Sequence, residues 1–180
     1  WFTIPEFVIE TLPFKRGDIV DGILGISKAL HSIAAIKIMS ERHDIHRAVG
    51  DKTSEWFAMN KITERGIYTP PTPDSPSQKI NPEDLDNFQP TIFIYDNYPG
   101  GIGFTPLLFD YHEELLDETH KMLKGCNCEN GCPSCVGPSK EVGQNSKKIA
   151  IAILELLTSK NVKSQARPEH PYDSQKQYLN

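Results

Sequence analysis

The chain of 180 residues has neither a long apolar run nor an excess of basic side chains. No uninterrupted apolar run approaches the roughly 18–20 residues needed to cross a bilayer, and no signal-peptide pattern opens the sequence. We therefore expect a soluble, cytoplasmic protein with no membrane partner. The formal net charge of −5 argues against a free-standing nucleic-acid-binding domain. Because the sequence begins with Trp1 and not with Met, we expect it to be a fragment of a longer chain.

The sequence also lacks the motifs that bind nucleotide phosphates. A strand-like apolar segment is followed by Asp96–Phe104, which contains Gly100, Gly101 and Gly103. This loop has neither the Lys-Ser/Thr ending of a P-loop nor the third glycine of a dinucleotide-binding fingerprint. Its glycines predict a tight turn with positive φ angles. The alternative is a contact to a DNA phosphate or to a neighbouring domain through Gly100 and Gly101.

Catalytic groups are not clearly indicated. Asp96, His112 and His120 would be the candidates for a hydrolytic site in an independent enzyme. The two histidines lie eight residues apart on one predicted helix and are more simply surface residues. We therefore expect that the chain by itself is not an enzyme.

Cysteine occurs in a single stretch, residues 125–135, in the order Cys-x-Cys, three residues, Cys-x-x-Cys. Gly131 and Pro133 favour tight turns around the third cysteine. Four thiolates at this spacing can converge on one ion, and the preferred occupant is one structural Zn²⁺ with tetrahedral bonds of about 2.3 Å. Four thiolates leave no position for water, so the site is predicted to be structural and not catalytic. The predicted ligands are Cys126, Cys128, Cys132 and Cys135.

Three alternatives to a zinc site stay open from the sequence. Two local disulfides would close very short loops, and Cys126 and Cys128 are too close for good disulfide geometry. Four reduced thiols within ten residues, with none elsewhere, are hard to explain by packing. An iron–sulfur cluster also takes four cysteine ligands, and spacing alone does not exclude it.

The N-terminal part predicts short strands followed by a buried helix. Residues 1–24 have the pattern of extended segments, with the apolar runs Phe7–Ile9 and Ile19–Val20 between prolines and a glycine. From Gly25 to about Met39 the apolar spacing becomes helical, and His31 within it is expected to be a core histidine.

The middle of the chain is less regular until its clearest strand. Residues 41–66 carry charges of both signs, which predicts a solvated face. The alternative is a strip that contacts phosphates or a neighbouring domain. Beside it, Trp56 and Phe57 predict a strand or hairpin. The proline-rich segment 68–90 predicts a loop or insertion. Residues 91–95 are five β-formers that are apolar on both faces, which predicts a central strand.

Two helices flank the cysteines. The first is predicted over Thr105–Lys124, with its first residue as N-cap and a proline next. The second is predicted over Ser146–Leu157, with Lys147 and Lys148 pointing outward. Together these patterns predict an α+β fold over residues 1–162. It has a small, mostly antiparallel or mixed sheet, three main helices and a Cys₄ knuckle between the last two. A polar tail is predicted over residues 163–180.

One family shares the order of these signals. The chain contains Tyr95-Asp96-x-x-Pro99-Gly100-Gly101-x-Gly103, then a helix, then Cys126-x-Cys128-x-x-Gly131-Cys132-Pro133-x-Cys135. This order resembles the C-terminal zinc-binding (MZB) domain of MrfA-type superfamily 2 DNA helicases, most strongly over residues 91–157. The resemblance implies that the four cysteines bind zinc.

The same resemblance implies a role inside a larger enzyme. The family's helicases move 3′ to 5′ on single-stranded DNA with ATP and are implicated in DNA repair, and their motor motifs lie in upstream domains. We expect this chain to organise those motor domains and the path of the single strand. Candidate contacts to DNA or to a neighbouring domain are Lys147, Lys148, Gly100 and Gly101. The alternative is a protein-interaction module that docks a repair partner such as a nuclease.

Overall fold

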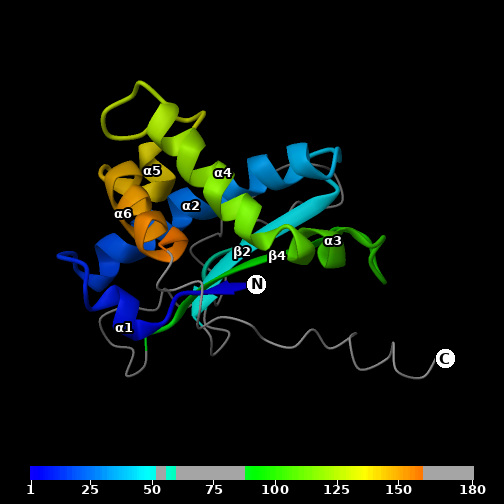
Figure 1. Cartoon of the computed structure of the whole chain (residues 1–180), viewed down its shortest axis with the longest axis horizontal. Coiled ribbons are helices and arrows are strands. Elements are labelled where there is room, and N and C mark those ends of the chain that lie inside the picture. The colour runs from blue at the N-terminus through cyan, green and yellow to red at the C-terminus, as the bar shows by residue number, and fades with distance from the viewer. Residues whose placement is uncertain (52–55, 60–87, 160–180) are drawn as a thin grey trace, which may run out of the picture.

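The centre of the fold is a helix whose apolar residues recur at spacings of four, three and four. Ile19, Ile23, Ile26 and Leu30 are each at most 1% exposed, as expected for a helix that packs on more than one side. This helix, α2 (Arg16–Lys37), lies between a sheet and two further helices (Figure 1). The computed structural model describes residues 1–51, 56–59 and 88–159.

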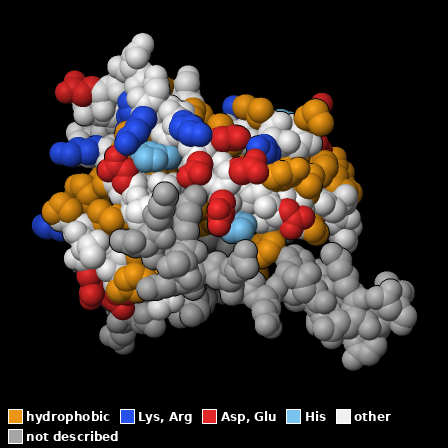
Figure 2. Space-filling view, in the orientation of Figure 1, with side chains coloured by type: hydrophobic (Ala, Val, Ile, Leu, Met, Phe, Trp, Pro, Cys, Tyr) orange, Lys and Arg blue, Asp and Glu red, His pale blue; other side chains and the backbone are white. Residues whose placement is uncertain are grey.

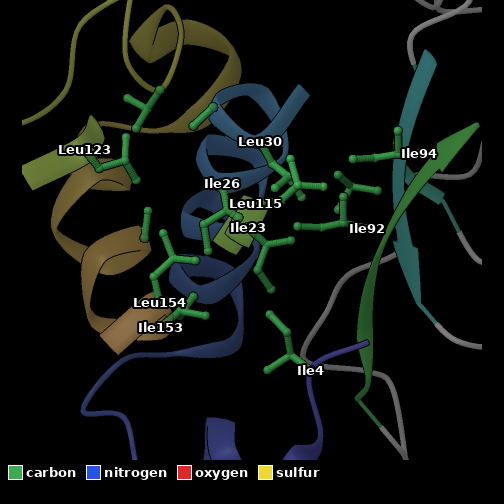
Figure 3. Close-up of a cluster of buried hydrophobic side chains, with 14 of the residues drawn as sticks. Ile4, Ile23, Ile26, Leu30, Ile92, Ile94, Leu115, Leu123, Ile153 and Leu154 are labelled. Atoms are coloured by element: carbon green, nitrogen blue, oxygen red, sulfur yellow. The ribbon is translucent and has the colours of Figure 1, made fainter. Parts of the chain in front are cut away.

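Four strands form one antiparallel sheet in the order β1-β4-β2-β3. Their bounds are β1 (Phe2–Thr3), β2 (Ile45–Asp51), β3 (Trp56–Met59) and β4 (Pro90–Asp96). Along the inner pair, Val49 faces Ile92 across the β2–β4 ladder. Figure 3 shows Ile92 and Ile94 of β4 pointing toward α2, so the sheet closes one side of the apolar core. The predicted central strand over 91–95 is confirmed.

Besides α2, the described residues form five helices. They are α1 (Glu6–Ile9), α3 (Phe104–Asp110), α4 (His112–Gly125), α5 (Ser139–Val142) and α6 (Ser146–Thr158). The long ones, α4 and α6, pack on α2 and on each other, and Figure 3 shows Leu123, Ile153 and Leu154 within this layer. The predicted α+β class, the small sheet and the knuckle between the last two main helices are confirmed.

Two predictions for the first half of the chain are wrong. Residues 1–24 are not mainly extended: α1 contains Phe7–Ile9, and α2 begins at Arg16 rather than Gly25. Gly22 and Gly25 suggest a break, but a helix tolerates glycine where a neighbouring backbone must come close. A Cβ on Gly22 would lie 2.5 Å from Ile149 Cγ2 of α6.

The mixed-charge stretch 41–66 is not simply a solvated face. Its first part forms β2, in which Ile45, Ala48 and Val49 are at most 2% exposed. The strand expected at Trp56 and Phe57 is confirmed as β3. Most of the predicted insertion 68–90, and the whole predicted tail 163–180, lie outside the described residues.

The helix predicted over Thr105–Lys124 is two helices. Tyr111 lies between α3 and α4 with φ −92° and ψ 11°, values at which the helix is interrupted. The N-cap of α3 is Gly103, in the left-handed conformation with φ 90°, and not Thr105. The Thr105 hydroxyl instead donates to Asp96 Oδ1 at 2.8 Å.

Among the described residues, α2 is long and apolar enough to cross a membrane by length and composition alone. Its best window has a mean hydropathy of 1.5, but 61% of that window is buried inside the fold. Core helices pass the same test, so this property is weak evidence for a membrane segment.

Candidate metal centre

The four cysteines converge on one point between α4 and α6. All four Sγ atoms lie within 4.8 Å of one another. The sulfurs of Cys126 and Cys128, of Cys128 and Cys135, and of Cys132 and Cys135 are each 3.5 Å apart. Cys126 Sγ is 3.8 Å from Cys132 Sγ. Disulfides are not formed, and these separations are far from the roughly 2.05 Å of an S–S bond.

These distances fit a single tetrahedral ion. Bonds of about 2.3 Å from Zn²⁺ to four sulfurs place the sulfurs about 3.8 Å apart. Four of the six sulfur–sulfur separations, at 3.5–3.8 Å, are close to that value, and all six are within 4.8 Å. Four thiolates are also the ligand set that structural zinc sites use. The donor set and its spacing therefore suit one zinc ion.

Tight turns bring the two cysteine pairs together. The backbone amides of Cys135, Val136 and Gly137 all donate to the carbonyl of Cys132, each at 3.1 Å. Gly131 adopts φ 116°, and a Cβ there would lie 2.5 Å from Val136 Cγ2. Glycine is therefore required at position 131, both for the backbone angle and for the space.

The surroundings shift the pKa values of two of the thiols in opposite directions. Backbone N–H groups of Cys135 and Ser134, together with the Cys135 side chain, lower the pKa of Cys132 to about 7. Burial raises the pKa of Cys135 to about 12. These hydrogen bonds thus favour the thiolate at Cys132, whereas burial disfavours it at Cys135, and thiolate is the form that binds metal.

The prediction that Lys147 points outward is wrong. The side chain is 6% exposed, and its Nζ donates to the carbonyl oxygen of Cys126 at 2.7 Å and to that of Cys128. Nζ also lies 3.5 Å from Cys128 Sγ. The helical spacing indicates the inward direction of Lys147, because Lys147, Ala150 and Leu154 share one face of α6 and the last two are fully buried.

The other predicted contact residues lie elsewhere. Lys148 is exposed on α6. Gly100 and Gly101 have φ angles of 89° and 71° in the loop between β4 and α3, which confirms the predicted positive-φ turn. This loop and the knuckle stand at opposite ends of the α3–α4 pair (Figure 1). The four predicted contact residues therefore do not form one surface.

Of the residues considered for hydrolysis, Asp96 and His112 are hydrogen-bonded, and His120 Nε2 has no hydrogen-bond partner among the described residues. Asp96 accepts hydrogen bonds from the backbone of Ile102, at 2.8 Å, and from the backbone of Thr105, at 3.0 Å. His112 Nδ1 is 2.7 Å from the carbonyl of Phe109. His120 Nε2 lies 3.9 Å from Glu155 Oε1 on α6. The predicted core histidine, His31, is hydrogen-bonded to the carbonyl of Ile45 at 2.9 Å.

Known proteins are similar to this chain over part of its length. The family model for MZB, the MrfA Zn-binding domain, matches residues 26–136. "Uncharacterized ATP-dependent helicase YprA" of Bacillus subtilis (strain 168) is 28% identical over 136 residues, which are 76% of this chain and 14% of that protein. "Uncharacterized protein MJ1572.1" of Methanocaldococcus jannaschii is 44% identical over 71 residues, which are 38% of this chain and 63% of that protein.

Among solved structures, the crystal structure of the DUF1998 helicase MrfA bound to DNA has a similar fold. The TM-score is 0.54 at 24% identity, over 80% of this chain and 15% of the helicase. At this identity the likeness concerns the fold. The chain spans only 14% and 15% of the two helicases that it resembles.

Proposed function

Because this chain belongs to the family of MrfA Zn-binding domains, we propose that it is the structural zinc-binding domain of an ATP-dependent DNA helicase. The observation that carries the proposal is the convergence of four cysteine sulfurs within 4.8 Å at tetrahedral spacing. Cys126, Cys128, Cys132 and Cys135 would hold one Zn²⁺, which stabilises the fold and supplies no chemistry to a substrate.

The helicase part of the proposal rests on the relatives. One relative is described as an ATP-dependent helicase and another is a helicase bound to DNA, and each is several times longer than the matched region. In this proposal the rest of the parent chain holds the ATP site and moves 3′ to 5′ on single strands during DNA repair. This domain acts as a rigid scaffold for the motor domains. A cytoplasmic location belongs to the same proposal, since reduced cysteines suit a reducing compartment.

Direct DNA binding by the domain is proposed to be weak. On the face in Figure 2, acidic and basic side chains are interspersed, so this face offers no continuous basic track for phosphates. The net charge of −5 is also unfavourable. Of the two lysines considered for DNA contact, only Lys148 is exposed.

The test is the metal content of the purified chain. We expect one zinc per chain by elemental analysis, and a lower melting temperature after a strong chelator removes it, because structural zinc contributes directly to folding. The purified chain should also show no ATPase activity, since its sequence has no P-loop.

Three results would contradict the proposal in different ways. A brown protein with iron and labile sulfide would replace zinc with an iron–sulfur cluster. A metal-free protein whose melting is unchanged by chelator would remove the metal altogether. Robust ATPase activity would overturn the accessory role.

A further inference from the structure

One charged side chain from outside the knuckle reaches the candidate metal centre. Lys147, the second residue of α6, extends its side chain into the knuckle and is 6% exposed. Its ammonium touches the Cys126–Cys128 arm at three atoms: the two carbonyl oxygens and Cys128 Sγ, the last at 3.5 Å. The neighbouring Lys148 on the same helix is exposed.

A buried ammonium requires compensation. Removing a charged group from water costs several kcal/mol unless it is paired and hydrogen-bonded. The carbonyls of Cys126 and Cys128 satisfy two of its three donors but carry no net charge. The nearest anion to be expected is the thiolate of Cys128.

The metal centre in turn requires positive charge near its sulfurs. Four thiolates around one Zn²⁺ leave two negative charges uncompensated. In an interior of low dielectric constant this excess weakens metal binding unless cations or N–H donors face the sulfurs. Outer residues that do so are known to change metal affinity by about 10–100-fold when they are replaced.

The sulfurs are not equally supplied with donors. Cys132 receives backbone N–H groups from Cys135 and Ser134, and Cys135 Sγ receives the Cys132 N–H at 3.2 Å. Cys128 Sγ faces the Lys147 ammonium. Within the described residues, the hydrogen-bond partners of Cys126 Sγ are other thiols.

We propose that Lys147 is a positioning residue of the metal centre, which compensates thiolate charge at Cys128 and holds the Cys126–Cys128 arm in place so that the metal is released slowly. The inference rests on the proposed assignment of the four cysteines as zinc ligands. A second consequence is that Cys126, whose sulfur contacts other thiols and not the ammonium, reacts faster with electrophiles than Cys128.

The experiment compares the zinc-loaded full chain with K147M and K148M. Methionine keeps most of the length of lysine without its charge, and Lys148 is the matched exposed control. The readouts are the rate of zinc transfer to excess chelator, the absorption spectrum after cobalt substitution, and the helical content by circular dichroism. We expect K147M to release zinc about 10–100-fold faster, with an altered cobalt–thiolate band and unchanged helical content. K148M should behave like the unmodified chain.

The outcomes separate this inference from the proposed function. An unmodified chain without zinc refutes the zinc assignment itself. If the unmodified chain contains zinc but K147M has the same release rate and the same cobalt spectrum, the role proposed for Lys147 is refuted and the zinc assignment is kept. K147R keeps the charge, so it should release zinc more slowly than K147M.

A further measurement needs no variant, in case K147M does not fold. Limited alkylation of the zinc-loaded chain, mapped by mass spectrometry, compares Cys126 with Cys128, which are both half-buried. We expect Cys126 to react first. Equal rates or the reverse order would overturn the proposal.

Discussion

At the scale of single residues, Asp96 shows how the glycine loop is stabilised. Its Oδ2 accepts the backbone N–H groups of Ile102 and Gly103 at 2.8 and 3.1 Å, and its Oδ1 accepts the backbone and hydroxyl of Thr105. A carboxylate therefore already occupies the amides that a phosphate would use. The suggested phosphate contact at Gly100 and Gly101 stays a prediction, and any phosphate there would meet this negative charge.

These bonds give the loop a pH dependence. Partial burial acts to raise the pKa of Asp96, but hydrogen bonds from Thr105 and from the backbone of Ile102, Gly103 and Phe104 outweigh it and lower the pKa below 3.8. A lowered folded pKa means that the stabilisation is present above the unfolded pKa and is lost as pH falls through the folded value. We expect the Gly103 amide resonance to be constant above about pH 4 and to shift below it.

Replacing the carboxylate tests the same contact at neutral pH. An asparagine side chain has only one acceptor oxygen, so D96N should lower the free energy of unfolding by about 1 kcal/mol, a small value because these hydrogen bonds are exposed to solvent. Urea unfolding of D96N against D110N provides the measurement, since Asp110 is exposed at the end of α3. Equal stability of the two variants would contradict a structural role for Asp96.

Residue patterns in the sequence predict some of these positions and not others. The spacing of the four cysteines is sufficient to indicate a common site. The inward direction of Lys147 is present in its spacing to Ala150 and Leu154, although a lysine beside a second lysine suggests an exposed pair. The four bonds of Asp96 depend on the path of the loop, which no local pattern specifies.

At the scale of elements, the α2–α6 crossing explains why glycine lies inside a long helix. Gly22 places the α2 backbone against Ile149, whose Cβ and the Ala150 amide would also lie within 3.3 Å of an added Cβ. Gly25 plays a similar part beside Val136, at 3.2 Å. The helix thus contacts both α6 and the segment directly after the knuckle.

This crossing predicts opposite effects for two glycine substitutions in α2. G22A should lower the free energy of unfolding by about 1–2 kcal/mol, because the overpacking outweighs the gain in helix propensity. G17A meets no atom within 4 Å and should raise it by about 0.5 kcal/mol. Thermal or urea unfolding of both variants checks the pair. A stabilising G22A would mean that the crossing is loose.

Element boundaries were harder to predict than element types. The interruption at Tyr111 has neither glycine nor proline at that position. It places the Tyr111 ring 5.2 Å from Lys37 Nζ, which also pairs with Glu114 at 2.5 Å and Glu118 at 3.0 Å. The helical periodicity of a sequence does not predict such tertiary contacts. By contrast, Ile19 and Ile23 are buried and four residues apart, a helical spacing that indicates a start of α2 before Gly25.

At the scale of the whole molecule, the knuckle lies among four helices. It follows α4 directly and precedes α5 and α6, and Val136 packs against Gly25 of α2. An ion bound there would therefore fix the relative positions of these helices. The sheet has its own apolar contacts with α2 through residues such as Ile92 and Val49.

Loss of one cysteine ligand should destabilise the helices around the knuckle more than the sheet. C132S should lose zinc, because three thiolates do not complete a tetrahedral Cys₄ site, and with it a contribution on the order of 10 kcal/mol. Hydrogen exchange should increase most in the last turn of α4 and the first turn of α6, and less in the β2–β4 ladder. S134A is the control, since Ser134 is exposed in the same turn. Uniform exchange across C132S would indicate a single cooperative unit.

The sheet order has a consequence for the sequence of folding events. β4 lies between β1 and β2, and Thr3 bonds Thr91 across 88 positions in the chain. During synthesis the first half can make helices and the β2–β3 pair, but β1 and β2 have no strand between them until residues 90–96 emerge. The knuckle, by contrast, closes within ten residues and bears little loop-closure cost. The slow step of folding should therefore be the insertion of β4, with metal capture a local and rapid event.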